Sequence, residues 1–257
     1  MRIVRFTPGP DAGLGQDPLF GVLEDDGLIS IISGDPIYSG IQKTAATIPL
    51  NKVRLLAPII PRSKVVCVGK NYADHAAEMG GVVPEEPIIF LKPNTSVIGP
   101  NDTIVWPEMS ERVDHEAELA IVIGRICKDV PKERVNDVIF GYTIANDVTA
   151  RDLQKKDGQW TRAKGFDTFC PIGPWIDTDF VPGTQKITAT IAGEVKQSAQ
   201  ISDMIFDVPT IINFVSRVMT LLPGDVILTG TPAGIGPMVA GEKATMAIEG
   251  LGELTNK

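Results

Sequence analysis

The chain has 257 residues, 43% of them hydrophobic, and a formal net charge of -8. This length suits one large domain, alone or with a small extension, and the hydrophobic content supports a sizeable core. Neither nucleic acid nor an anionic membrane attracts a net acidic chain, so we expect no such partner. No apolar stretch approaches the length of a membrane span, the N-terminus reads as a strand, and the three cysteines form no CxxC pair. We therefore expect a cytoplasmic protein with reduced thiols.

The N-terminal quarter of the chain predicts a small β-rich unit. Residues 20–31 have the pattern of a hairpin, because the pair Asp26-Gly27 lies between two apolar runs. The segment 55–61 is expected to be a connector, since its two prolines block continued strand pairing. We predict a small N-terminal β-rich domain at residues 1–57, followed by a catalytic domain at residues 64–257.

Strands dominate the rest of the chain, and helices are few. Besides two strands that carry carboxylates, strand-like runs occur at 65–69, 88–92, 186–191 and 226–230. A short helix is expected at residues 71–81 with a double-glycine stop, and a second at 208–222, where apolar residues recur at helical spacing before Pro223-Gly224. Because strands and helices do not alternate regularly, the sequence predicts an α+β fold of packed sheets instead of a doubly wound parallel sheet.

Three acidic residues are candidates for a metal site. Glu116 and Glu118 are two residues apart at the start of an apolar strand, so period two places them on one face, and Asp147 ends a second strand-like run. A Glu-x-Glu pair on a strand is more often a solvated face. The adjacent buried-type run at 119–123 changes this balance, because carboxylates beside a core strand are costly unless they are paired or bind a metal. The pattern favours a divalent cation such as Mg²⁺.

One of the two histidines is a candidate general base. His75 and Glu78 lie three residues apart on the short helix, so a carboxylate can support the imidazole. An exposed His-Glu pair of this spacing is also common surface decoration. The following Gly80-Gly81 makes residues 70–84 a candidate mobile lid. His115 alternates with Glu116, so it is expected to point to the opposite face and to be structural.

Five segments in a fixed order resemble the fumarylacetoacetate hydrolase family. They run from about residue 64 to the C-terminus, whereas residues 1–57 match only loosely. The segments are Val68 to His75, Asp114 to Leu119, Gly141 to Asp152, Lys164 to Pro174, and Leu228 to Gly236.

The resemblance implies a fold and a metal. The fold is β-rich, with packed, rolled mixed sheets, few short helices and a small N-terminal β unit. The metal is Mg²⁺ or Mn²⁺, bound by Glu116, Glu118 and Asp147. A homodimer is expected from the family alone.

The resemblance also implies the residues that act on the substrate. His75 and Glu78 would form an acid–base dyad on a lid that closes over the substrate. Lys164, beside the metal, would stabilise a developing enolate. Alternatively, Lys164 is a solvated surface lysine with no role in catalysis.

Four further residues are implied to bind the substrate. Arg151 and Gln154 would hold its oxygens from one side of the pocket. Thr231, in a Gly-Thr-Pro turn, would offer its hydroxyl and backbone N–H to the substrate carboxylate, although it can also simply shape the turn. Lys70 stands where small relatives usually have arginine, so it keeps the charge but loses bidentate carboxylate binding.

These roles imply an enzyme that acts on small 2-oxo acids. Cleavage of the C3–C4 bond through a metal-bound enolate would make it an oxaloacetate decarboxylase, which we favour, with acylpyruvate hydrolysis as a possible second reaction. An alternative of the same class is the 2-hydroxyhepta-2,4-diene-1,7-dioate isomerase and 5-oxopent-3-ene-1,2,5-tricarboxylate decarboxylase of aromatic catabolism. A different class is a non-catalytic protein whose acidic cluster holds a structural cation.

Overall fold

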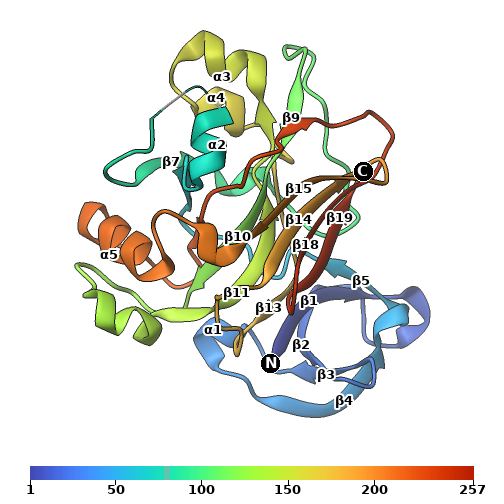
Figure 1. Ribbon diagram of the computed structural model, residues 1–257. Coiled ribbons are helices and arrows are strands. Elements are labelled where there is room, and N and C mark those ends of the chain that lie inside the picture. The colour runs from blue at the N-terminus through green and yellow to red at the C-terminus, as the bar shows by residue number, and fades with distance from the viewer. Residues whose placement is uncertain (79, 81) are drawn as a thin grey trace.

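The computed structural model describes residues 1–78, 80 and 82–257. Most of its strands join one large, strongly curved sheet, in which the neighbours run β4-β3-β2-β1-β13-β11-β10-β16-β6-β7 (Figure 1). Two more strands join at the side, since β5 pairs with β1 and β8 pairs with β13. The strands of this sheet are β1 (Arg2–Pro8), β2 (Leu19–Leu23), β3 (Leu28–Ile32), β4 (Lys43–Pro49), β5 (Val53–Leu56), β6 (Val65–Gly69), β7 (Ile88–Lys92), β8 (Val97–Ile98), β10 (Ala117–Ile123), β11 (Ile139–Asn146), β13 (Cys170–Asp177) and β16 (Val226–Leu228).

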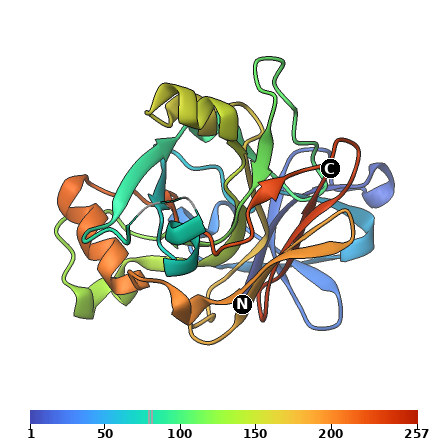
Figure 2. The same cartoon turned by 45° about the horizontal axis from the view of Figure 1, so that its top comes forward.

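Two smaller sheets complete the β structure. One has the order β12-β9-β17, and the other has the order β15-β14-β18-β19. Figure 2 shows the second one standing beside the large sheet. Their strands are β9 (Val113–His115), β12 (Thr149–Ala150), β17 (Gly236–Pro237), β14 (Lys186–Ile191), β15 (Glu194–Gln200), β18 (Ala244–Ile248) and β19 (Gly252–Asn256).

The helices are short. The α-helices are α1 (Pro36–Ser39), α2 (Ala73–Glu78), α3 (Arg151–Asp157), α4 (Thr161–Lys164) and α5 (Val208–Val218). Helices α2, α3 and α4 gather at one end of the large sheet (Figure 1). Short 3₁₀ helices lie at Pro10–Ala12, Leu50–Lys52, Asn94–Ser96, Lys132–Asp137 and Ile201–Asp203. Among the described residues, no helix is both long enough and apolar enough to cross a membrane.

Strand β10 explains why the site lies next to the core. Its odd-numbered residues, Leu119 and Ile121, belong to the apolar cluster that α5 and the four-stranded sheet cover. Its even-numbered residues, Ala120 and Val122, belong to a second cluster on the other face. A strand that is buried on both faces needs a continuous apolar sequence, as this one has. By the same alternation, Glu118 shares the face of Ala120 and Val122.

The predicted α+β, β-rich fold is confirmed, since antiparallel pairs mix with the parallel pairs β16–β6 and β13–β8. The expected strands at 65–69, 88–92 and 186–191 have those bounds. The strand expected at 226–230 ends at Leu228. The N-terminal strands also belong to the large sheet, because β1 pairs with β13. The division into two domains stays a prediction.

Two more local expectations need correction. The connector expected at 55–61 begins later, because Leu55 and Leu56 still pair with β1 and only Pro58 ends the ladder. The helix expected at 208–222 ends at Val218, because Leu221 forms a β-bridge with Cys127 instead.

The short helix expected at 71–81 is α2, which is described from Ala73 to Glu78. Met79 and Gly81 lie outside the described residues. The proposed hinge at Gly80-Gly81 and the lid over residues 70–84 therefore stay predictions.

Candidate active site

The three predicted metal ligands lie together in the structure. Oxygen atoms of Glu116, Glu118 and Asp147 are all within 4.8 Å of one another, and all three side chains are buried. Glu118 belongs to β10, Asp147 follows β11, and Glu116 occupies the break between β9 and β10. The break is held on both sides, because Glu116 N–H donates to Asn146 Oδ1 at 2.9 Å and Glu116 O accepts from Asp147 N–H at 2.9 Å.

Lys164 lies between two of these carboxylates. Its ammonium group is 2.9 Å from Glu116 Oε2 and 2.6 Å from Asp147 Oδ2, and it also donates to Thr149 Oγ1 at 2.9 Å. Burial alone would lower the pKa of Lys164, but the charges of Asp147 and Glu116 outweigh burial and raise this pKa above its ordinary value. Lys164 is therefore a buried, permanently positive group, which rules out a solvated surface lysine.

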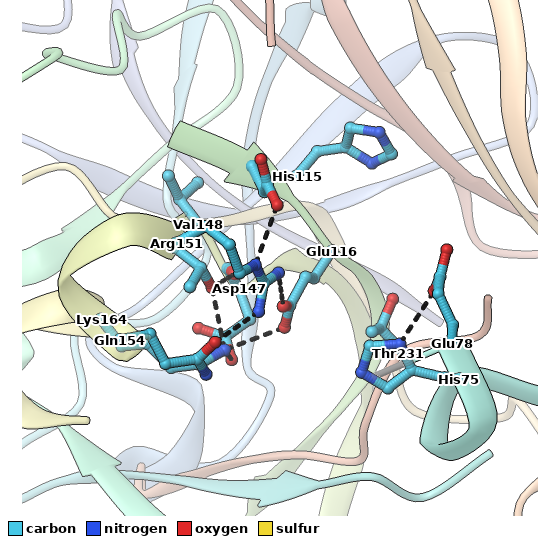
Figure 3. A network of polar contacts seen from close by, with 12 residues as sticks. His75, Glu78, His115, Glu116, Asp147, Val148, Arg151, Gln154, Lys164 and Thr231 are labelled. Atoms are coloured by element: carbon cyan, nitrogen blue, oxygen red, sulfur yellow. Dashed lines mark hydrogen bonds and ion pairs between the residues drawn. The ribbon is translucent and has the colours of Figure 1, made fainter. Parts of the chain in front are cut away.

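Arg151 approaches the cluster from the start of α3. Its guanidinium donates to Glu116 Oε1, to Asp114 Oδ2 at 2.8 Å and to Gln154 Oε1 at 2.7 Å (Figure 3). Burial opposes ionisation of Glu116, but the charges of Lys164 and Arg151 prevail, so the pKa of Glu116 lies below its ordinary value. Glu116 is thus held as a carboxylate.

Glu118 has a different environment. Its Oε2 accepts a hydrogen bond from Gly230 N–H at 2.7 Å. Within the described part of the chain, no lysine or arginine forms an ion pair with it, although cations pair with Glu116 and Asp147. Burial, together with the charges of Asp147 and Glu116, raises the pKa of Glu118 well above its ordinary value. A cation bound beside Glu118 would favour its ionised form.

This arrangement fits a hard divalent cation. Carboxylate oxygens are the ligands that Mg²⁺ and Mn²⁺ prefer. Opposite ligands of an octahedral Mg²⁺ ion are about 4.2 Å apart, twice the usual bond length. The three oxygens lie within 4.8 Å of one another, so small side-chain adjustments bring them within reach of one ion.

The predicted acid–base pair is beside the same pocket. His75 Nδ1 lies 3.3 Å from Glu78 Oε2 (Figure 3). The Glu78 carboxylate also accepts from the backbone N–H of Gly234. His75 is buried, with 5% of its surface exposed, whereas Glu78 is on the outer side of α2. The histidine is therefore not surface decoration.

Nine of the ten residues that the sequence assigned to the site line one pocket, and Glu78 is the exception. The pocket lining includes His75, Glu116, Glu118, Asp147 and Lys164 together with Lys70, Arg151, Gln154 and Thr231. Lys70 adopts a left-handed backbone conformation, with φ of 56°, directly after the end of β6.

Thr231 is more constrained than the sequence suggests. Its hydroxyl donates its single proton to Ala117 O at 2.9 Å and accepts from Gln197 Nε2 at 2.7 Å. A substrate carboxylate can therefore take this proton only by replacing Ala117 as acceptor. The binding role of Thr231 stays a prediction.

Sequence reasoning missed Lys92, which is fully buried at the end of β7. Its ammonium group lies 2.5 Å from Asp147 Oδ1 and 3.1 Å from Val148 O. The sequence carries a weak signal for it, since a lysine ends an apolar strand immediately before Pro93.

Two other polar residues were also missed. Asp114 is fully buried between Arg112 and Arg151, and it holds the guanidinium of Arg151 in place. Gln197, on β15, uses its amide to join Thr231 to His115.

His115 points away from the carboxylates, as the sequence predicted (Figure 3). Its Nδ1 lies 3.1 Å from Gln197 Oε1, and burial lowers its pKa. The neutral ring is therefore part of the packing between β9 and the four-stranded sheet.

Known protein families match nearly the whole of this chain. Residues 64–257 match the family model described as Fumarylacetoacetate (FAA) hydrolase C-terminal, and residues 1–58 match the model described as Rv2993c-like, N-terminal. The oxaloacetate tautomerase Fahd2a, mitochondrial, of Rattus norvegicus is 44% identical over 82% of this chain and 71% of its own length.

Two solved structures extend the comparison. The 2-hydroxyhepta-2,4-diene-1,7-dioate isomerase from Mycobacterium marinum is 50% identical, with a TM-score of 0.88 over 100% of this chain and 97% of its own. The maleylpyruvate hydrolase from Sphingobium sp. SYK-6, in complex with manganese (II) ion and pyruvate, is 33% identical, with a TM-score of 0.81 over 100% of this chain and 98% of its own. The chain therefore belongs to the fumarylacetoacetate hydrolase family.

Proposed function

We propose that this protein is a divalent-metal-dependent enzyme that enolises a small 2-oxo dicarboxylic acid, with oxaloacetate as the favoured substrate. Glu116, Glu118 and Asp147 would hold Mg²⁺ or Mn²⁺. The single observation that carries the proposal is a buried histidine, supported by a carboxylate, in the same pocket as three clustered carboxylates and a buried lysine.

The positive groups of the site would stabilise the reacting oxygen atoms. When bound, the divalent ion supplies Lewis-acid chemistry, which draws electron density toward a 2-oxo oxygen. Lys164 adds a fixed positive charge where negative charge develops on that oxygen. Arg151 and Lys70 hold the carboxylate groups of the substrate, and Gln154 orients the guanidinium of Arg151.

His75 would move the proton. It takes a proton from C3 as the C3–H bond breaks, and the electron pair of that bond forms the C2–C3 double bond of the enolate. Glu78 stabilises the imidazolium that results, at a contact of 3.3 Å. The imidazolium then returns the proton to the oxygen, and the reverse sequence gives the keto form.

The buried base favours proton transfer over simple decarboxylation as the main outcome. Loss of carbon dioxide from oxaloacetate also gives an enolate, but it needs no base at C3. Tautomerisation needs one, and the rat relative carries the name oxaloacetate tautomerase. Decarboxylation and acylpyruvate hydrolysis are alternative reactions at the same site. In hydrolysis, His75 would activate water.

A second candidate is isomerisation of 2-hydroxyhepta-2,4-diene-1,7-dioate. The solved structure from Mycobacterium marinum that carries this name supports it, at 50% identity. The reaction moves a proton along a conjugated 2-hydroxy acid and needs the same base and cation, but it also needs room for a longer chain.

The test is turnover with added Mg²⁺ or Mn²⁺ on oxaloacetate, acetylpyruvate and the dienoate. For oxaloacetate, malate dehydrogenase reports formation of the keto form from the enol, and lactate dehydrogenase reports pyruvate. We expect rapid production of the keto form with little pyruvate. Pyruvate at the same rate as loss of the enol would assign decarboxylation, and activity on the dienoate alone would assign the isomerase.

Adding a chelator to the same assays distinguishes a catalytic cation from a structural one. If the cation is only structural, the chelator lowers the melting temperature, and no substrate of the panel is turned over with or without metal. Removing a catalytic ion abolishes turnover.

A further inference from the structure

We propose that Trp160, held by Gly69 and Phe90, is the residue that limits the length of substrate that this site accepts. The inference rests on the proposed function and deepens it, because it assigns the site to 2-oxo acids with a short chain beyond C3. It follows from how the indole is fixed and from what surrounds it.

The indole ring lies directly against the backbone of Gly69. A Cβ atom added at Gly69 would be 2.8 Å from Trp160 Cζ3 and 3.0 Å from Trp160 Cη2. Both distances are shorter than a normal contact, so this glycine is the residue type that lets the ring come so close. On another side, the ring of Phe90 meets the indole edge to face, with centroids 5.1 Å apart and planes at 77°. Two contacts thus fix the position of Trp160.

The wall that Trp160 forms is apolar, unlike the rest of the pocket. Val68, Phe90 and Trp160 line the same pocket as the charged residues. The cavity is only about 30 Å³, room for about two or three water molecules. Whatever enters therefore contacts this wall. An apolar wall cannot pair with a second carboxylate, but the ammonium group of Lys70, one residue beyond Gly69, can do so at the rim.

The segment that carries Lys164 also holds the wall in place. Trp160 immediately precedes α4, and its carbonyl accepts from the backbone N–H of Lys164 at 3.0 Å. The ammonium group of Lys164 lies 5.0 Å from the centre of the Phe90 ring. The same short segment therefore carries both the charge for the 2-oxo oxygen and the indole of the wall, so the space between them is set by the fold and a longer chain must displace Trp160.

The test compares Trp160→Ala with the wild type on oxaloacetate, acetylpyruvate and straight-chain acylpyruvates of increasing length. Trp106→Ala is the matched control, because Trp106 is half exposed and lies outside this pocket. We expect Trp160→Ala to raise kcat/KM for the longest substrates, relative to the shortest, by about 10-fold or more, the scale that hydrophobic pocket contacts provide. The control should leave this ratio unchanged. A uniform loss at every length would overturn the proposal and would mean that Trp160 only positions α4.

A binding series separates this inference from the proposed reaction. N-alkyl oxamates of increasing chain length carry the chelating end of a 2-oxo acid and can be titrated calorimetrically with Mg²⁺, without turnover. Trp160→Ala should tighten the binding of long oxamates and leave oxamate itself unchanged, even where the reaction differs from the one proposed. Equal affinities in variant and wild type along the series would overturn the length limit. Where Trp160→Ala does not fold, Trp160→Phe keeps a ring against Phe90 and should give the same trend to a smaller extent.

Discussion

Lys92 and Asp147 form a fully buried ion pair, with the ammonium nitrogen 2.5 Å from Asp147 Oδ1. Lys164 contacts the other oxygen, Oδ2, at 2.6 Å. Lys92 therefore anchors one oxygen of the carboxylate and turns the other toward Glu116. It supports a proposed metal ligand from behind, as outer partners commonly do.

Replacing Lys92 with methionine should weaken metal binding by about 10–100-fold, which is the usual effect of losing such a partner. The measurement is titration with Mn²⁺, followed by electron paramagnetic resonance. Lys64→Met is the matched control. Lys64 forms a comparable ion pair with buried Asp225, at 2.6 Å, and this pair lies outside the site. It should lower stability without changing Mn²⁺ affinity. Tighter Mn²⁺ binding in Lys92→Met would show that Lys92 only repels the cation.

The stabilisation that Mg²⁺ gives should increase with pH. Burial and the neighbouring carboxylates raise the pKa of Glu118, so the folded protein keeps a proton that the unfolded chain releases above about pH 4.3. Without metal, this group therefore lowers the free energy of unfolding as the pH rises toward the raised folded pKa. Bound metal removes the penalty, because it needs the ionised form.

Melting temperatures measured with and without Mg²⁺ across this pH range test the prediction. The difference should be small at acidic pH and should grow toward neutral pH. In Glu118→Gln, which keeps an acceptor for Gly230 N–H, the pH-dependent part of the difference should disappear while the protein still folds. A Mg²⁺-induced shift that is independent of pH would contradict the environment described for Glu118.

His75→Ala should separate the possible reactions. General-base catalysis is typically worth about 10²–10⁴-fold, so tautomerisation and acylpyruvate hydrolysis should fall by that factor. Formation of pyruvate from oxaloacetate should fall less, because loss of carbon dioxide needs no base. Both rates can be followed in one variant by the two coupling enzymes. Equal losses would assign His75 to substrate positioning.

Lys164→Met should lower kcat far more than it raises KM. A charge directed at a developing oxyanion acts mainly in the transition state, and losing such a group typically costs about 10²–10³-fold. Lys156→Met, on the exposed side of α3, is the control and should change neither parameter. If KM rises while kcat stays intact, Lys164 binds the ground-state carboxylate instead.

Much of the fold was predictable from local pattern. Strand-like runs such as 65–69 and 186–191 gave strands with the expected bounds, because the pattern of apolar residues and the flanking turn residues are local properties. The end of α5 was not predictable, because the pairing of Leu221 with Cys127 joins segments that are far apart in sequence.

Some residues of the candidate site were likewise predictable from local sequence, and others were not. Glu116, Glu118 and Asp147 follow from strand ends and period two. Lys92 and Gln197 do not, because each acts through a side chain on a strand that only the tertiary fold brings near.

The position of β16 has a consequence for the order of folding. This strand lies between β10 and β6, third from one end of the large sheet, and Gly230, just after it, supplies the hydrogen bond to Glu118. The chain must therefore be synthesised beyond residue 230 before β10 can be joined to β6 and β7. Contacts at such large sequence separation slow folding, and until they form the edges of β10 and β6 remain unpaired. A ribosome-bound chain that stops short of β16 should bind chaperones and lack the carboxylate cluster, and release of the full chain should produce both the sheet and the site in one late step.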